Sequence, residues 1–290
     1  MVIAERRRFE AELADLEVFP PDRRARVPPA QTLAIPNRWI CRLTAPDIDA
    51  TAGSYGMGTG VLIGPRHVLT AAHVLVSVQD QRRTVGDRLR VQIARNGETA
   101  PFAPVGIRGW RVNPRWVRAI QQPAANGRPA RTRWILQPQH DYGLVTLDRD
   151  VSSWPIGPCT LGHWGAAGPC ANGAFIGMAP ADVQGQQAVV TGYPGDKGGT
   201  ALWTAGGPIS LEPRLGTLLH TIDTCPGQSG APVWAMQGDR CQLIGVHSGA
   251  NGRWTTDANH RQVLSHNGAA LLSPAVVQQL RLWMGTSARP

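Results

Sequence analysis

The stretch Thr221–Trp234, with the sequence TIDTCPGQSGAPVW, decides the fold of this chain. Its central letters, GQSG at 227–230, predict a sharp turn, because glycine adopts backbone angles that other residues avoid. Such a turn presents the hydroxyl of Ser229 and leaves neighbouring backbone N–H groups pointing in one direction. We therefore expect Ser229 to be a nucleophile, with an oxyanion hole formed by the N–H groups of Gly227 and Ser229.

Two earlier segments contain the partners that such a nucleophile needs. The segment SYGMGTGVLIGPRHVLTAAHVL at 54–75 carries His73, and QHDYGLVTL at 139–147 carries Asp141 at the start of an apolar strand. A serine hydroxyl is a poor nucleophile at neutral pH, so an imidazole must take its proton during attack. A carboxylate then fixes the tautomer of that imidazole and stabilises its charged form. The sequence therefore predicts a triad of His73, Asp141 and Ser229, although either earlier segment alone would be unremarkable.

Composition favours an all-β protein. The 290 residues include 33 Gly and 24 Pro but only 4 Phe and 3 Tyr, which is typical of many turns and short strands. Short β-like runs recur from about residue 38, and together they indicate a barrel or a sandwich. These runs are WICRL, GTGVLIG, HVLTAAHVL, RLRVQIA, YGLVTL, QAVVTGY, LGTLLHTI, APVWAM and CQLIGVHSG.

Charge and cysteine content leave several partner classes open. The 29 Lys and Arg against 20 Asp and Glu give a net charge of +9, which favours encounters with acidic partners. No basic motif interleaved with aromatic residues and no Cys-x-x-Cys pair occurs, so we expect no nucleic-acid partner and no metal. No apolar run long enough to span a bilayer is present, so we expect a soluble chain that binds no membrane. Of the five cysteines, Cys159 and Cys170 are spaced for a disulfide, but two free thiols fit equally well.

The chain divides into an extension and one folded domain. Residues 1–37 are predicted to be an N-terminal extension with a Pro- and Arg-rich linker, and residues 38–290 a single domain. Within the domain, residues 111–139 are basic and featureless, which indicates a surface insertion. Ser273 followed by Pro274 predicts the start of a terminal helix over 273–284.

Taken together, TAAHVL, HDYGLVTL and GQSGAPVW resemble the chymotrypsin-like serine peptidases in both order and context. With DRRARV, WICRL, GTGVLIG, GYPGDK and GVHSG, the similarity is greatest to bacterial glutamyl endopeptidases of the V8 type, from about Asp22 onward. The resemblance implies two antiparallel six-stranded β-barrels, at about 38–150 and 151–272. It also implies a monomeric serine endopeptidase that acts on polypeptides without a cofactor. The family is secreted, yet the chain shows no signal peptide, so a cytoplasmic location stays open.

The resemblance leaves the cleaved bond undecided. In V8-type enzymes, a hydroxyl residue five positions before the nucleophile and a histidine on the following strand bind a glutamate side chain, and Thr224 and His247 match them. Trypsin-like enzymes place an acid six positions before the nucleophile, where this chain has Asp223. Cleavage after Glu is the leading hypothesis, cleavage after Arg or Lys is its competitor, and a catalytically silent binding module is a third possibility.

One departure from the wider superfamily concerns activation. Digestive members carry an Asp before the nucleophile that pairs with a newly exposed amino terminus, whereas this chain has Gln228. Aligned on DRRARV, mature V8-type enzymes begin near Val18, and their amino terminus approaches the acidic-residue pocket. Residues 1–17 are therefore predicted to be a propeptide removed after Glu17, with a plain surface helix as the alternative. The spacing from His73 to Asp141 is also long, which we attribute to the basic insertion.

Overall fold

The computed structural model describes residues 18–45, 58–76, 89–122, 131–256 and 262–286. Its first half is a curled sheet of six strands in the order β5-β2-β3-β4-β9-β6. Among the described residues, the two outer strands are not paired with each other, and a single antiparallel bridge joins Val91 on β5 to Val105, just before β6. The strands of this sheet are β2 (Ile40–Thr44), β3 (Gly58–Gly64), β4 (His67–Thr70), β5 (Arg90–Ile93), β6 (Ile107–Val112) and β9 (Gly143–Leu147).

The second half is a closed barrel. Its six strands follow the order β14-β13-β16-β17-β18-β15, and an additional pairing between β14 and β15 completes the ring. The prediction of an all-β, chymotrypsin-like fold is therefore confirmed, with the difference that only the second barrel is closed by strand pairing. The strands are β13 (Gln187–Gly192), β14 (Trp203–Glu212), β15 (Thr217–His220), β16 (Pro232–Gln237), β17 (Arg240–Thr256) and β18 (Gln262–Leu271).

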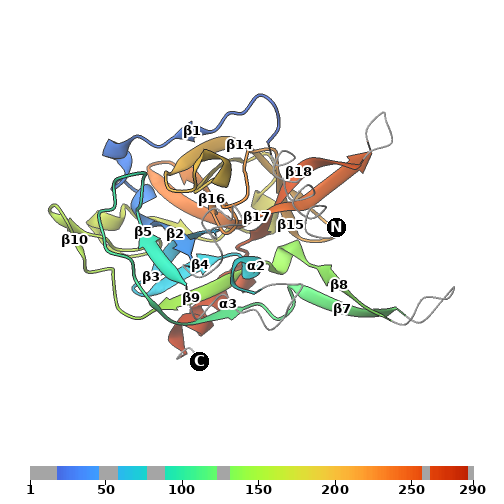
Figure 1. Ribbon diagram of the computed structural model, residues 1–290, viewed down its shortest axis with the longest axis horizontal. Coiled ribbons are helices and arrows are strands. Elements are labelled where there is room, and N and C mark those ends of the chain that lie inside the picture. The colour runs from blue at the N-terminus through green and yellow to red at the C-terminus, as the bar shows by residue number, and fades with distance from the viewer. Residues whose placement is uncertain (1–17, 46–57, 77–88, 123–130, 257–261, 287–290) are drawn as a thin grey trace.

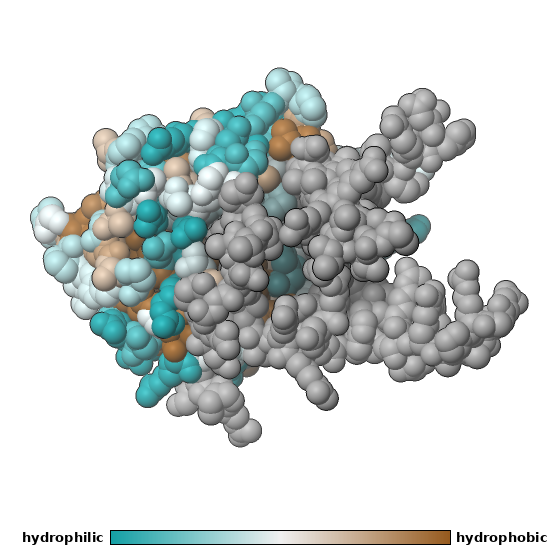
Figure 2. Space-filling view, in the orientation of Figure 1, coloured by the Kyte–Doolittle hydropathy of each residue, from teal (hydrophilic) through white to brown (hydrophobic). Residues whose placement is uncertain are grey.

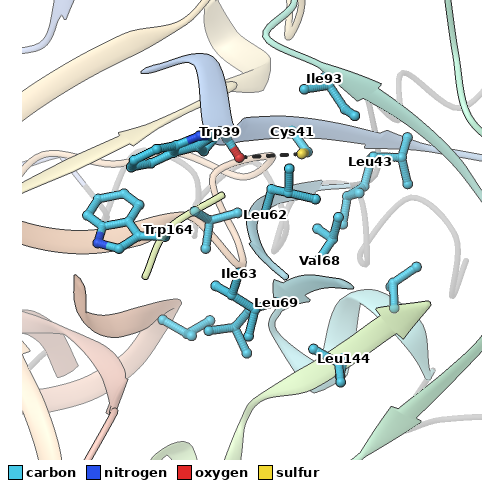
Figure 3. Packing of buried hydrophobic residues seen from close by; sticks show 14 of the residues in the cluster. Trp39, Cys41, Leu43, Leu62, Ile63, Val68, Leu69, Ile93, Leu144 and Trp164 are labelled. Carbon is cyan, nitrogen blue, oxygen red and sulfur yellow. Dashed lines mark hydrogen bonds between the residues drawn. The ribbon is translucent and has the colours of Figure 1, made fainter. Parts of the chain in front are cut away.

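The two halves share an apolar core. Every residue of β3 is buried, because β3 lies in the middle of the first sheet with a strand on either side. Figure 3 shows Leu62 and Ile63 from β3 among the side chains of β2, β4 and β9. The same cluster reaches Leu243 and Val246 on β17, so removal of apolar surface from water also holds the halves together.

The segment that connects the two halves contains a disulfide. Strands β10 (Pro155–Ile156) and β11 (Cys159–Thr160) form a small hairpin, after which a short 3-10 helix, η6 (Pro169–Ala171), follows. Cys159 and Cys170 are bonded, which decides between the two alternatives left by their spacing. The other cysteines, Cys41, Cys225 and Cys241, are buried and do not belong to this disulfide.

The terminal helix is confirmed. α3 spans Pro274–Gly285, and the Ser273 side chain accepts a hydrogen bond from the Val276 N–H, as an N-cap does. Leu280 is buried, and the ring of Trp283 lies 5.9 Å from that of Tyr142. The helix therefore docks against the first half, next to the residue that follows Asp141.

The basic insertion differs from its prediction. β7 (Val117–Gln122) and β8 (Arg131–Leu136) pair along their whole length as an antiparallel hairpin, so the description of this region as featureless was wrong. In Figure 1 the hairpin extends away from the body as an arm beside α2. Its second strand leads through η5 (Pro138–His140) directly into Asp141.

The segment after residue 17 packs on the body. β1 (Ala25–Arg26) pairs with the first two residues of β14, and η1 (Pro29–Gln31) and η2 (Asn37–Trp39) follow. Val27 is buried with Tyr193 and Leu202 from the second half. Contacts thus cross the predicted boundary at residue 38, which itself stays a prediction. In the view of Figure 2, hydrophilic side chains gather along the upper edge, over β1 and β14. None of the helices in the described ranges is both long and apolar enough to cross a bilayer.

Candidate active site

His73 lies on a single helical turn, α2 (Ala72–Leu75), directly after β4. Its Nδ1 is 2.6 Å from Oδ2 of Asp141, and its backbone N–H donates to Oδ1 of the same carboxylate over 3.0 Å. The two contacts hold both the ring and the backbone of His73. One carboxylate therefore fixes where the imidazole lies and which way it faces.

Asp141 is 2% exposed and lies between η5 and β9. Its Oδ2 also accepts a hydrogen bond from the hydroxyl of Ser248, on β17 of the closed barrel. Burial by itself would raise the pKa of Asp141, but the charge of His73 and the hydrogen bonds from His73 and Ser248 outweigh it and lower the pKa. Asp141 is thus a carboxylate at neutral pH, which places the imidazole proton on Nδ1 and leaves Nε2 of His73 as a base.

Ser229 is held where the two halves of the molecule meet. Its carbonyl oxygen accepts from the N–H of Thr59 on β3 over 2.8 Å, and the next N–H, that of Gly230, donates to the carbonyl of His247 over 2.8 Å. Gly227 and Gly230 have φ angles of 101° and 85°, which confirms the sharp turn. A Cβ on Gly227 would lie 2.5 Å from the carbonyl oxygen of Tyr193, so the turn requires glycine there.

Two backbone donors beside Ser229 are available to a ligand. Within the described part of the chain, neither the N–H of Gly227 nor that of Ser229 donates to another group. The carbonyl of Gly227 is instead occupied, since it accepts from the hydroxyl of Thr59 over 2.8 Å. This is the arrangement that an oxyanion hole requires.

Gln228 closes its own turn. Its side-chain Oε1 accepts from the N–H of Cys225 over 3.1 Å, and its N–H donates to the carbonyl of Cys225 over 3.0 Å. The side chain is fully buried. An uncharged amide therefore occupies the position at which digestive relatives carry an acid.

Thr224, His247 and a third residue that the sequence did not indicate, His220, share one side of the closed barrel. His220 Nε2 lies 3.2 Å from His247 Nδ1, and the N–H of Ile222 donates to His220 Nδ1 over 3.3 Å. Burial lowers the pKa of His220 to about 3. Burial, with the neighbouring His220 and His73, also lowers the pKa of His247 well below its usual value.

These contacts assign the protons of the two neutral imidazoles. Because His220 Nδ1 accepts from a backbone N–H, the proton of His220 is on Nε2 and points to Nδ1 of His247. The proton of His247 is then on its own Nε2. That atom is buried and has no hydrogen-bond partner among the described residues. His247 thus presents a neutral, desolvated N–H donor.

Thr224 is held by a residue on β18. Asn267 donates through Nδ2 to the hydroxyl oxygen of Thr224 over 3.0 Å and to the carbonyl of Ile222 over 3.1 Å. Asn267 is also the register partner of His220 across β15 and β18. Since the oxygen of Thr224 accepts this bond, its proton is directed elsewhere.

Asp223 has a different environment from the one predicted for it. Its Oδ1 accepts from the N–H of Phe19 over 2.7 Å, and Oδ2 accepts from the N–H of Arg23 over 2.9 Å and from Arg23 Nε over 3.1 Å. The residue is completely buried. The N-terminal segment thus occupies both oxygens of this carboxylate.

Three contributors were missed by sequence reasoning. Ser248 follows His247 within the quoted motif GVHSG, so its place beside the triad was open to inference from that spacing. His220 and Asn267 carried no such signal, since each is one polar residue in an otherwise ordinary strand. Among the described residues, no three His, Cys, Asp or Glu side chains are grouped as metal ligands would be.

The closed barrel, the curled half-barrel and the pairing of His73 with Asp141 are those of a two-barrel, serine-peptidase-like class. A family described as "Trypsin-like peptidase domain" matches residues 58–246, which is more than half of the chain, and the chain belongs to that family. It is 28% identical over 224 residues to a glutamyl endopeptidase of Bacillus licheniformis, covering 77% of this chain and 56% of that protein. The chain therefore spans little more than half the length of this relative.

Solved structures agree on the fold. A Glu endopeptidase in complex with MPD superposes with a TM-score of 0.64 at 20% identity, covering 93% of this chain and all of the other. The protease Anisep from Arthrobacter nicotinovorans superposes with a TM-score of 0.50 at 15% identity, covering 83% and 93%. At such identities the likeness concerns the backbone alone.

Proposed function

We propose that the protein is a serine endopeptidase in which Ser229 is the nucleophile, His73 the general base and Asp141 its orienting carboxylate. The observation that carries the proposal is the double contact of Asp141 with His73, which leaves Nε2 of His73 unprotonated, as the nitrogen of a general base must be. A binding module that had lost catalysis would have no need to keep a buried carboxylate matched to an imidazole in this way.

In the first half of the reaction, Nε2 of His73 takes the proton of Ser229 while Oγ bonds to the carbonyl carbon of the substrate. The carbonyl oxygen becomes negative and accepts hydrogen bonds from the N–H groups of Gly227 and Ser229. When the C–N bond breaks, His73 returns the proton to the leaving amine and an ester on Ser229 remains. A water then repeats these steps on the ester and releases the carboxylic acid and free Ser229.

Cleavage after glutamate is the specificity that we propose. The buried Nε2–H of His247 has no hydrogen-bond partner among the described residues, and a carboxylate needs such a donor when water is excluded. Thr224, held by Asn267, is the hydroxyl residue that the resemblance to V8-type enzymes places with it. The similarity to a protein named glutamyl endopeptidase points the same way. The competing preference for Arg or Lys has less support, because Asp223 is buried and both of its oxygens already accept hydrogen bonds from the N-terminal segment.

The proposal is tested with peptides that differ only in the residue before the cleaved bond, namely Glu, Gln, Asp, Arg and Lys. We expect the highest kcat/KM for Glu, with loss of all turnover and of fluorophosphonate labelling in Ser229→Ala. Thr224→Val should reduce the preference for Glu over Gln by about 10-fold, the value of one hydrogen bond to a charged group. Thr217→Val is the matched control, since Thr217 is a buried threonine of the same barrel whose hydroxyl has no partner among the described residues. Turnover of Arg or Lys peptides alone would overturn the Glu assignment.

We further propose that residues 1–17 are removed by cleavage after Glu17. Support comes from the contacts of Phe19 and Arg23 with Asp223, because these hold Val18 next to the segment that carries Thr224. N-terminal sequencing of active protein should give Val18. Glu17→Gln should keep the chain full-length and slow its activation, whereas an active protein that begins before Val18 would contradict the proposal.

A further inference from the structure

Arg24 is a buried cation held between two carboxylates. Its side chain is 1% exposed, and it forms two hydrogen bonds to Asp22, each 2.9 Å long, and two to Asp196, 3.0 and 2.5 Å long. Lys197 adds a contact of 3.3 Å to Asp22. The fork of a guanidinium suits this double bidentate geometry, which a lysine cannot reproduce. The N-terminal segment is thus fastened to Asp196, 172 residues further along the chain.

Asp196 lies on η8 (Gly195–Lys197), a single turn that contacts the loop carrying Ser229. The N–H of Gly195, the residue before Asp196, donates to the carbonyl of Pro226 over 2.8 Å. Pro226 directly precedes Gly227, whose N–H is one of the two donors beside Ser229. Arg24 is therefore linked to the oxyanion hole in two steps. It pairs with Asp196, and the residue before Asp196 bonds to the peptide unit that joins Pro226 to Gly227.

This contact fixes the orientation of that peptide unit. A trans peptide is planar, and its C=O and N–H point in opposite directions. The bond between Pro226 and Gly227 is not among the cis bonds, so the N–H of Gly227 points away from Gly195 as long as the carbonyl of Pro226 points toward it. If the peptide plane rotated by half a turn, the carbonyl would replace the N–H in the oxyanion hole.

The same segment also holds the other end of this loop. Phe19 and Arg23 donate to Asp223, three residues before Pro226. Gln228, on the far side of Gly227, bonds only within its own turn and supplies no charge that an amino terminus might pair with. Thr59 holds the carbonyl of Gly227 from the first half of the molecule. The carbonyl of Pro226, which belongs to the same peptide unit as the Gly227 N–H, is held by η8, and Arg24 with Asp196 fastens η8.

We propose that Arg24 and Asp196 are positioning residues for catalysis, which clamp η8 against Pro226 and so keep the Gly227 N–H in the oxyanion hole. The clamp rests on the serine-peptidase activity proposed above and does not depend on the preference for glutamate. An internal arginine in the N-terminal segment thereby takes the ordering role that a free amino terminus has in digestive relatives.

The test measures how fast an alkyl fluorophosphonate labels Ser229, because this reagent places its phosphoryl oxygen in the oxyanion hole whatever the side-chain specificity. Asp196→Asn keeps the shape of Asp196 and removes its charge, and Arg24 retains Asp22 as a carboxylate partner, so its buried guanidinium is not left without a counter-charge. Asp148→Asn is the matched control, since Asp148 also pairs with an arginine, in an exposed position on the first half. Asp196→Glu tests whether another carboxylate at this position restores the labelling rate. Arg24→Lys tests whether the forked guanidinium is required.

We expect Asp196→Asn to label about 10- to 100-fold more slowly than the unaltered chain, a part of the loss caused by removing an oxyanion donor. The kcat for peptides should fall by a similar factor with little change in KM, because bound substrate does not yet carry the negative oxygen. Asp196→Glu should recover most of the rate, and Asp148→Asn should differ by less than about 2-fold. Arg24→Lys should resemble Asp196→Asn.

Several outcomes would overturn the clamp. Labelling of folded Asp196→Asn at the unaltered rate, or a change confined to KM, would assign this ion pair to fold stability alone. If Asp196→Asn did not fold, full activity of Arg24→Lys would have the same meaning. Absence of labelling in the unaltered chain, after removal of residues 1–17, would instead reject the serine-peptidase activity and the clamp together.

Discussion

Asp141 and Asp223 are both buried carboxylates, yet they have different partners. Asp141 accepts from the backbone and ring of His73 and from the hydroxyl of Ser248. Asp223 accepts from the backbone N–H groups of Phe19 and Arg23 and from the guanidinium of Arg23. The first carboxylate orients a side chain that can move a proton, whereas the second fastens a segment of the chain. Burial alone therefore does not assign a function to a carboxylate, and its donors do.

The partners of Asp223 make it a poor binding site for the Arg or Lys side chain of a substrate. A carboxylate binds an incoming Arg or Lys only if it has unused lone pairs and a route to the substrate. Asp223 has three protein donors and no exposed surface. Binding a basic side chain there would first require the N-terminal segment to leave.

The largest effect should come from Asp141→Asn. An amide in place of the carboxylate would accept from His73 less strongly and would favour the wrong imidazole tautomer, so kcat should fall by about 10⁴-fold. Steady-state kinetics with the best peptide measures this change. The free energy of unfolding should fall by far less than the 5 kcal/mol or so of barrier that this factor represents. A loss below about 10-fold would show that the buried contact of Asp141 with His73 is structural.

Asp223→Asn should act on stability instead. One oxygen is replaced by an amide NH2 that faces donors, so we expect the free energy of unfolding to fall by about 1–3 kcal/mol in urea titrations. Amide exchange at Phe19 and Arg23 should become faster, and Glu should remain the preferred residue before the cleaved bond. If the unaltered chain cleaved after Arg or Lys and this variant did not, Asp223 would be a specificity residue and not a structural one.

The sequence predicted His73, Asp141 and Ser229 as catalytic residues because each lies in a local motif, and the structure brings His73 and Asp141 into contact. The turn around Ser229, the run before His73 and the strand after Asp141 have patterns of small and apolar residues that short-range rules recognise. The capped helix after Ser273 was equally local. The partners of Asp223 were not predictable in this way, since Phe19 lies 204 residues earlier and no spacing rule links the two positions. The hairpin of β7 and β8 was missed because its residues do not alternate clearly between polar and apolar.

His220 and His247 extend the comparison from carboxylates to imidazoles. Asp141 keeps its charge in the interior because His73 and Ser248 compensate for burial. The two histidines have each other as side-chain neighbours, and a second positive charge beside the first would be repelled. Burial therefore keeps them neutral, and the same low dielectric has opposite consequences for the two kinds of group.

The smallest predicted effect concerns the pH dependence of the free energy of unfolding. The pKa of His220 is 6.5 when unfolded and about 3 when folded, so between these values the unfolded chain binds one more proton than the folded chain. Its contribution is complete above pH 6.5 and is lost as the pH falls toward 3, at about 1.4 kcal/mol per pH unit. In His220→Gln, the fall in unfolding free energy between pH 6 and pH 5 should be smaller by about that amount. Thr217→Val, at a buried threonine of the same strand that does not titrate, is the control and should keep the original slope. Equal slopes in both variants would mean that His220 is protonated in the folded protein, and the neutral N–H donor assigned to His247 would then have to be withdrawn.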